Sequence, residues 1–342
     1  MDDLSTPTLQ TVIDQQPLLL KRFTVLSIIG QGAAGAVYRV LDHKSRKGRE
    51  CALKVLTEPE AFDENTITRF EEELRVCRNV RHPNVIEAYE LIKLENALAF
   101  TMEYVDGVDL GKILEKFKDN FELIDRVMVQ LLAGLHELHL HGIVHRDVKL
   151  ENVLLRKDGV VKLADLGLMK DLFGKGLTDT GVLLGTAQYL SPEYVTTGKC
   201  DARGDVYSAG VLLWELTTGQ RRLGKMTGQE VITHLTRSKF KFSDEDLELV
   251  PERYRVVVAK AVELKPGRRF QNALEMQEAF GQEYQPVLDV PEVLGESGGV
   301  PPLISSGGIP SKLSKKLGSL ITVSLVVGFM AFLAGAVISI LR

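Results

Sequence analysis

The chain has 342 residues, of which 44% are hydrophobic and 26% charged, so it can bury a large core and its length alone permits two domains. Its formal net charge of −4 provides no basic field, so nucleic acid is not an expected partner. The three cysteines are odd in number and lack the spacing of a disulfide framework or a zinc site, which indicates reduced thiols.

Residues 1–22 are interpreted as an N-terminal extension. They lack the basic start and the long apolar run of a signal peptide, because Leu18-Leu19-Leu20 is too short for that run.

A glycine-rich hairpin is predicted at residues 29–37, between apolar strands at 23–29 and 37–41. The pattern G-x-G-x-x-G-x-V is made by Gly30, Gln31, Gly32, Gly35 and Val37. Because glycine has no Cβ atom, backbone N–H groups can approach phosphate oxygens closely at such a turn. A dinucleotide-binding fold would need a helix directly after the glycines, whereas a strand follows here. The pattern therefore predicts a loop that covers a nucleotide, although the hairpin taken alone is equally compatible with a plain turn.

The loop at residues 145–152, with the sequence HRDVKLEN, holds a candidate base, a cation and a metal ligand within a few residues. In a phosphoryl transfer reaction Asp147 would accept the proton of an attacking hydroxyl, Lys149 would lie near the transferred phosphate, and Asn152 would bind Mg²⁺. A single His-Arg-Asp triplet is weak evidence, because three common residues recur by chance. The order of further motifs along the chain carries the argument.

Other short motifs flank this loop in a fixed order. An apolar strand at 51–56 contains one lysine, Lys54, and a helix with three consecutive glutamates at 71–73 follows it. After the loop come Leu-Ala-Asp-Leu-Gly at 163–167 and Gly-Thr-Ala-Gln-Tyr-Leu-Ser-Pro-Glu at 185–193.

Taken together, these motifs resemble those of eukaryotic-type (Hanks-type) serine/threonine protein kinases, in particular the membrane-anchored bacterial members. The resemblance covers roughly residues 23–281 and implies a two-lobed α+β protein kinase fold. A small β-rich N-lobe would extend to about Ala99, and a hinge would connect it to a larger helical C-lobe. The implied reaction is transfer of the ATP γ-phosphoryl to serine or threonine hydroxyls of proteins, with Mg²⁺, or Mn²⁺ in its place, as the metal. Lys149 and Thr186 indicate the serine/threonine class rather than the tyrosine class.

The resemblance assigns a role to each matching residue. Catalytic roles fall to Asp147, Lys149, Lys54 and Glu73, and metal binding to Asn152 and Asp165. Nucleotide-binding roles fall to Gly30, Gln31, Gly32, Gly35, Val37, Ala52, Lys54, Met102, Glu103, Tyr104, Asp109 and Leu154. Glu73 is chosen as the partner of Lys54 from the register to His82-Pro83-Asn84, and the glutamates at 71 and 72 are expected to face solvent. Backbone groups of Glu103 and Tyr104 would bind adenine, with Met102 as gatekeeper. Asp109 would meet the ribose, although a helix N-cap is an equal alternative.

Two buried supports are also implied by the resemblance. Asp205 would brace the catalytic loop, and Arg269 would pair with Glu193. Departures from the family pattern are conservative: Leu166 stands where most kinases carry phenylalanine, and Ser191 where they carry alanine.

Regulation is expected between Gly167 and Gly185. Arg146, directly before the base, would bind a phosphate on Thr180 or, secondarily, on Thr178, and Lys170 would be a second cation for it. A transient homodimer would perform this phosphorylation in trans. The alternative is a polar loop with no switch.

Residues 282–319 form a predicted flexible linker, rich in proline and glycine and basic at its end. Residues 320–341 carry no charge and, at about 1.5 Å per residue, would span roughly 33 Å, against a hydrocarbon core of about 30 Å. They are predicted to be a transmembrane helix that anchors the chain in a lipid bilayer. The lysines before this span place the kinase domain in the cytoplasm by the positive-inside rule, at the inner or plasma membrane of a bacterial cell. A buried soluble helix is the alternative interpretation.

Two alternatives from other functional classes stay open. A membrane-tethered pseudokinase or scaffold would not turn over ATP. A small-molecule phosphotransferase would share the base and the metal ligands but usually lacks a segment like 186–193.

Overall fold

The computed structural model describes residues 21–281 except for a set of short gaps and the activation segment, namely 33–34, 45–46, 57–63, 95–96, 166–186, 225, 227–229, 231–232 and 234–239. The chain divides into two compact units, residues 1–293 and 294–342, and all described residues belong to the first. The predicted linker and transmembrane helix lie outside the described residues, as do Thr178 and Thr180. Among the described residues, no helix combines the length and apolar character that a membrane span needs.

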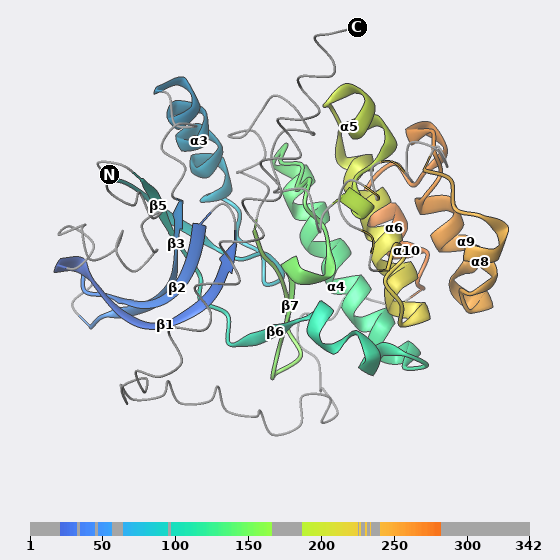
Figure 1. Ribbon diagram of the computed structural model, residues 1–342, viewed down its shortest axis with the longest axis horizontal. Coiled ribbons are helices and arrows are strands. Elements are labelled where there is room, and N and C mark those ends of the chain that lie inside the picture. The colour runs from blue at the N-terminus through green and yellow to red at the C-terminus, as the bar shows by residue number, and fades with distance from the viewer. Residues whose placement is uncertain are drawn as a thin grey trace, which may run out of the picture. The chain divides into compact units, whose positions relative to one another are not determined.

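The first lobe is an antiparallel sheet with one long helix beside it (Figure 1). Within the described ranges, five strands pair in the order β1-β2-β3-β5-β4. These elements are β1 (Phe23–Gly32), β2 (Gly35–Asp42), β3 (Arg49–Leu56), α3 (Glu64–Cys77), β4 (Ala88–Lys93) and β5 (Leu98–Met102). The sheet ends at Met102 and not near Ala99, because β5 stays paired with β3 as far as the Ala52–Met102 register. The predicted lobe boundary is therefore three residues too early.

The predicted glycine-rich hairpin connects β1 and β2, whose last pair is Gly32 with Gly35. Gly35 has a φ of +135°, and a Cβ atom there would lie 1.9 Å from the carbonyl oxygen of Val55 on β3. Only glycine fits this position, since both its backbone conformation and its close contact exclude a side chain. The hairpin is thus pressed against the neighbouring strand.

A polar cluster closes the start of this lobe. Arg22, placed in the N-terminal extension by the sequence, donates to both carboxylate oxygens of Asp42 at 2.9 and 2.7 Å and to Glu90 at 2.8 Å. Burial would raise the pKa of Asp42, but the Arg22 hydrogen bonds, the backbone N–H of Lys44 and the positive charges of both residues together lower the pKa. The folded lobe therefore begins at least one residue before β1.

The second lobe is mainly helical (Figure 1). Its central helix, α6 (Ala202–Thr218), is buried from residue 204 to residue 217. A helix that is buried on all sides needs other helices around it. These are α4 (Phe121–Leu140), α9 (Glu252–Ala261) and α10 (Ala273–Glu278). At Gly210 of α6, a Cβ atom would lie 2.7 Å from Ala261, so glycine permits the close approach of α6 and α9.

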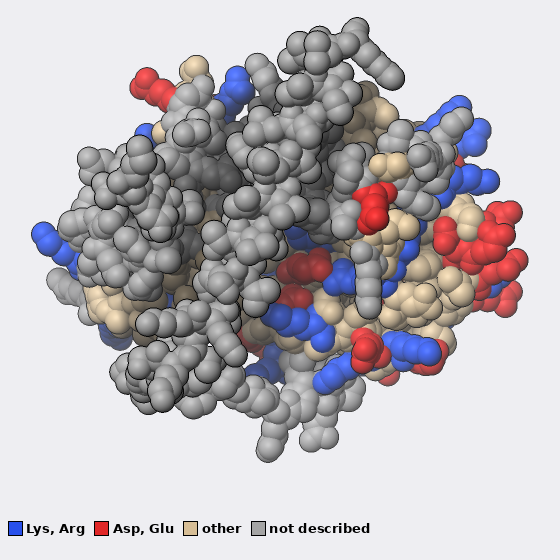
Figure 2. Space-filling view, viewed as in Figure 1, with Lys and Arg blue, Asp and Glu red and all other residues tan. Residues whose placement is uncertain are grey.

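Short elements complete the lobe. They are β6 (Gly107–Asp109), η2 (Leu110–Phe117), η3 (Leu150–Asn152), β7 (Val153–Arg156), β8 (Val161–Leu163), η5 (Ala187–Tyr189), α5 (Pro192–Thr197), α8 (Asp244–Glu248) and η6 (Pro266–Arg268). Strands β6, β7 and β8 form a second antiparallel sheet. Acidic residues begin α8, where a capping box joins Ser243 and Asp246, and these charges complement the helix dipole. Figure 2 shows this acidic group at the right-hand edge of the view, over α8 and α9.

Candidate active site

One face of the first sheet carries several of the predicted nucleotide-binding side chains. Val37 lies opposite Lys54, and Ala52 lies opposite Met102. Directly paired residues of antiparallel strands share a face, as do residues two apart on one strand. Val37, Ala52, Lys54 and Met102 therefore point to the same side of the sheet. The opposite face holds the buried core of the lobe, which includes Ala36, Tyr38, Val40, Leu53 and Val55.

Lys54 reaches from this face toward the second lobe. Its Nζ atom lies 2.5 Å from Oδ1 of Asp165 and 6.0 Å from the centroid of the Phe100 ring. The same ring packs edge-on against Phe70 of α3, with the centroids 5.6 Å apart. Glu73 lies three residues after Phe70, so both occupy the side of α3 that faces this region. The pairing of Lys54 with Glu73 stays a prediction, whereas Glu71 and Glu72 are exposed as predicted.

The catalytic loop holds Asp147 in a fixed orientation. Nδ2 of Asn152 donates to the Asp147 carbonyl at 2.8 Å and to Oδ2 of its carboxylate at 2.7 Å. The Nζ atom of Lys149 lies 3.0 Å from the same Oδ2. Asp147 is 8% exposed, so a buried carboxylate stands between a lysine and an amide. These three residues converge as the sequence predicts.

Asp165 is attached to the same loop through its neighbour. The backbone N–H of Ala164 donates to the Asn152 carbonyl at 2.8 Å, and the Ala164 carbonyl accepts from Nε2 of His145 at 3.0 Å. Asp165 and Arg146 both have positive φ angles, 57° and 61°. Such backbone strain in non-glycine residues is concentrated at functional sites.

The donor set suits a hard divalent cation. Because Nδ2 of Asn152 donates to Asp147, its Oδ1 atom is the one available to a metal, together with the carboxylate of Asp165. Mg²⁺ prefers oxygen ligands and usually takes one or two protein groups together with substrate phosphates. In the described part of the chain no group of three or more His, Cys, Asp or Glu side chains could hold a metal.

Asp205 supports the catalytic loop through backbone hydrogen bonds, as predicted. Its carboxylate accepts the backbone N–H of His145 and that of Arg146, each at 2.8 Å, and contacts Nε2 of His139 at 2.9 Å. Complete burial would raise the pKa of Asp205, but these hydrogen bonds and the nearby imidazoles outweigh burial and lower it. The sequence did not single out His139, because no local pattern links it to α6.

His145 itself is a neutral support. Burial lowers its pKa. Its Nε2 atom faces a carbonyl and must carry the proton, while Nδ1 accepts the backbone N–H of Asp147 at 3.2 Å. His145 thus fixes the backbone of the base.

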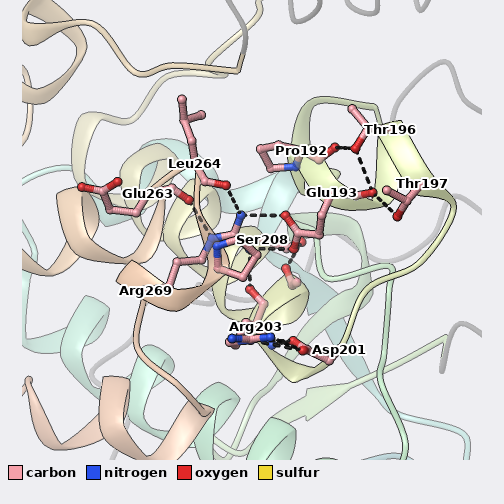
Figure 3. Close-up of polar contacts among 12 residues, drawn as sticks. Pro192, Glu193, Thr196, Thr197, Asp201, Arg203, Ser208, Glu263, Leu264 and Arg269 are labelled. Atoms are coloured by element: carbon pink, nitrogen blue, oxygen red, sulfur yellow. Dashed lines mark hydrogen bonds and ion pairs between the residues drawn. The ribbon is translucent and has the colours of Figure 1, made fainter.

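The predicted pair of Glu193 and Arg269 is bidentate, with both N–O distances 2.7 Å (Figure 3). The Arg269 side chain is fully buried and also donates to the carbonyls of Arg203, Glu263 and Leu264. Burial would raise the pKa of Glu193, but the hydrogen bonds from Arg269 lower it. This arginine joins α5, α6 and the turn before η6.

At the hinge, the structure shows which backbone group of Glu103 and which role of Asp109 are already used within the protein. The N–H of Glu103 donates to the Glu87 carbonyl at 2.8 Å, so its carbonyl is the group that we expect at adenine. Asp109 caps η2 by accepting from the N–H of Lys112 at 3.1 Å. The N-cap alternative is therefore confirmed, and a ribose contact stays a prediction. Leu154 lies opposite Asp109 on β7.

A second hydrogen-bond network at the catalytic loop was not predicted from the sequence. Arg221 donates to Glu151 at 2.6 Å and to the hydroxyl of Tyr189 at 2.9 Å, and that hydroxyl donates to the buried Glu215. Burial raises the pKa of Glu215. No spacing signal connects these four residues, which come from three separate segments.

Some predicted positions cannot be placed. Leu166, Lys170 and Thr186 lie outside the described residues, as do Thr178 and Thr180.

The three cysteines are free thiols, as predicted, and burial raises the pKa of Cys51 to about 11 and of Cys77 and Cys200 to about 12.

Comparison with known proteins agrees with this geometry. The sequence pattern of the family described as "Protein kinase domain" matches residues 23–284. The chain belongs to the protein kinase family. It is 36% identical over 263 residues to the serine/threonine-protein kinase PknL of Mycobacterium tuberculosis, covering 77% of this chain and 65% of PknL. It is 32% identical over 291 residues to the serine/threonine-protein kinase PknB of Mycolicibacterium smegmatis, covering 82% of this chain and 46% of PknB. The match thus spans less than two thirds of either relative.

A solved structure supports the fold. The crystal structure of the kinase domain of Mycobacterium tuberculosis PknI aligns with a TM-score of 0.59 and 22% identity, covering 82% of this chain and 99% of that one. The predicted two-lobed kinase fold and the predicted resemblance to bacterial serine/threonine kinases are confirmed.

Proposed function

We propose that this chain is a serine/threonine protein kinase that transfers the γ-phosphoryl of ATP to protein hydroxyls. The observation that carries the proposal is a chain of contacts: Asn152 binds Asp147, the backbone of Ala164 binds Asn152, and Asp165, the residue after Ala164, binds Lys54. A pseudokinase would not need to preserve this arrangement of a base, two metal ligands and a cation.

Each residue has a defined task in this reaction. The Oδ2 atom of Asp147 is oriented by Asn152 and Lys149, so the carboxylate is positioned to accept the proton of an incoming hydroxyl. Asn152 and Asp165 would hold Mg²⁺, which supplies charge stabilisation for the phosphates when bound. Lys54 carries a positive charge on the sheet face that would cover the nucleotide.

Acceptor specificity tests this proposal. Purified protein is incubated with Mg-ATP and either a generic protein substrate or a panel of small hydroxyl metabolites. Phosphorylation of the protein alone is expected. Transfer to metabolites alone would support the small-molecule phosphotransferase, and ATP binding without any transfer would support the pseudokinase.

We also propose that residues 320–341 tether the kinase domain to a membrane, with the domain on the cytoplasmic side. The uncharged stretch and the preceding lysines support this proposal. The full chain should sediment with membranes and require detergent, whereas a chain ending at Gly281 should stay in the supernatant. Release of the full chain by high salt or carbonate would contradict a transmembrane anchor.

Activation-loop phosphorylation is the proposed control. Thr178 and Thr180 lie between the catalytic loop and residue 187 in the sequence, and Arg146 stands beside the base with its backbone fixed by Asp205. A phosphate near charge −2 would be drawn to such a cation. Thr178→Ala with Thr180→Ala should lower the specific activity of the chain about tenfold or more. It should also abolish the rise in specific activity that phosphorylation in trans would give when more copies of the chain share one membrane. Unmodified threonines in fully active protein, detected by mass spectrometry, would contradict this.

A further inference from the structure

Lys162 of β8 and Glu103, the first hinge residue, form an ion pair that crosses from one sheet to the other. The Lys162 Nζ atom lies 2.8 Å from each of the two carboxylate oxygens of Glu103. Only 9% of the lysine side chain and 20% of the glutamate side chain are exposed. Such a pair keeps a defined geometry, because solvent does not separate the two charges.

The residues on either side of Lys162 on β8 are fixed by backbone hydrogen bonds. The N–H of Val161 donates to Gln130 at 3.1 Å, and its carbonyl accepts from Asn84 at 2.7 Å. The N–H of Leu163 donates to the Asn84 carbonyl at 2.8 Å, and its own carbonyl accepts from Ile86 at 3.1 Å. Lys162 therefore extends from a fixed strand.

The hinge end of the pair is also constrained. The Oε2 atom of Glu103 accepts the N–H of Glu87 at 3.2 Å, and the N–H of Glu103 donates to the Glu87 carbonyl at 2.8 Å. Together with Lys162, these contacts fix the Glu103 side chain and the peptide between Met102 and Glu103. They therefore restrict how the residue that carries the hinge carbonyl can turn.

The charges nearby make Glu103 the counter-charge of Lys162. The carboxylate of Glu87 faces two arginines, Arg49 at 3.7 Å and Arg81 at 3.6 Å. The pKa of His82 is lowered by its burial, and the ammonium of Lys162 adds to this effect. Loss of the Glu103 carboxylate would remove the ion-pair partner that the structure gives Lys162.

We propose that Lys162 is a positioning residue which, through Glu103, makes the nucleotide site select adenine over guanine. Adenine presents an amino donor where guanine presents a carbonyl oxygen. A fixed carbonyl acceptor at Glu103 binds the first and leaves the second facing another oxygen, which disfavours guanine. A hinge that can turn loses this discrimination. The inference rests on the proposed use of ATP.

The test compares nucleotide binding by Lys162→Met, which keeps the length of the side chain and removes its charge, with the unmutated chain. The Kd values for Mg-ATP and Mg-GTP are measured by calorimetry without any acceptor. For Lys162→Met, the ratio of the two Kd values should shift toward GTP by about tenfold, and ATP should account for most of the change. Lys162→Arg, which keeps the charge and donors, should retain most of the selectivity.

A control is Lys44→Met, because Lys44 forms an ion pair at the same 2.8 Å with Glu90 rather than with Glu103, and its side chain is 62% exposed. It should leave the ratio unchanged. A purely structural role for Lys162 would lower the fraction of active protein and kcat, with no change in the ratio of the Kd values. If Lys162→Met does not fold, Glu103→Gln takes its place, and the same loss of selectivity is expected.

Three results would overturn the inference. The first is an unchanged ratio in both Lys162→Met and Glu103→Gln, and the second is an equal shift in Lys44→Met. The third is binding of neither nucleotide by the unmutated chain. By contrast, selective ATP binding without phosphoryl transfer would contradict the proposed function and support the role of Lys162. The two proposals therefore fail separately.

Discussion

Replacing Arg269 with methionine should strongly destabilise the second lobe. The fully buried guanidinium supplies two hydrogen bonds of 2.7 Å to Glu193 and three to backbone carbonyls, at 2.7, 2.9 and 3.2 Å. Methionine fills similar space but leaves the Glu193 carboxylate, with a side chain 20% exposed, and these carbonyls without their donors. Breaking one side of a buried ion pair costs about 3–5 kcal/mol.

The size of this loss can be measured directly. At roughly 2–4 °C per kcal/mol for a domain of this size, Tm should fall by about 6–20 °C. Urea unfolding can be followed by fluorescence of Trp214, the single tryptophan, which is buried on α6. Glu193→Gln keeps one side-chain acceptor and the three backbone acceptors of Arg269 but removes its counter-charge, so it should cost less, about 2–3 kcal/mol. Equal losses in the two variants, or a Tm for Arg269→Met within about 2 °C of the unmutated chain, would refute this reasoning.

The same pair predicts a pH dependence with a definite sign. The pKa of Glu193 is lower in the folded state than the usual value of about 4.3 for the unfolded chain. Its contribution to the free energy of unfolding is therefore present above about pH 4.3 and is lost as pH falls through the folded pKa. The stability difference between the unmutated chain and Glu193→Gln should be constant between about pH 6 and 8 and shrink in acid. A difference that grows on acidification would contradict the assignment.

Two further predictions concern the site. Asp165→Asn should abolish turnover and weaken Mg-ATP binding about tenfold or more, whereas Asp147→Asn should abolish turnover with nucleotide affinity largely kept. Calorimetry measures the binding and a phosphotransfer assay measures the turnover. Full activity in either variant would contradict the site assignment. Asp205→Asn should lower kcat about a hundredfold with little change in the Kd of ATP. The reason is that the amide cannot accept both loop N–H groups as the carboxylate does. An unchanged kcat would contradict the supporting role of Asp205.

Motifs that act through local spacing could be predicted from the sequence. Asp147, Lys149 and Asn152 lie within six residues, so one loop brings them together whatever surrounds it. The strand at 51–56, which the sequence also predicted, places Lys54 and Ala52 on one face, since they are two residues apart. The family resemblance supplied the distant pairs, such as Glu193 with Arg269.

Contacts between residues far apart in sequence could not be predicted where no motif marks them. Lys162 meets Glu103 only because β8 and the hinge are neighbours in the fold. His139 reaches Asp205 across two packed helices, and the lobe boundary moved to Met102 because pairing of β5 with β3 continues past Ala99. These features depend on tertiary packing, which local periodicity does not contain.

Phosphoamino acid analysis tests the central claim most directly. The purified chain is incubated with Mg-ATP and a generic protein substrate, and the transferred phosphate is assigned to serine, threonine or tyrosine, with Asp147→Asn as the control. We predict phosphoserine and phosphothreonine, no phosphotyrosine, and loss of both products in Asp147→Asn. Absence of transfer by the unmutated chain, or undiminished transfer by Asp147→Asn, would contradict the account.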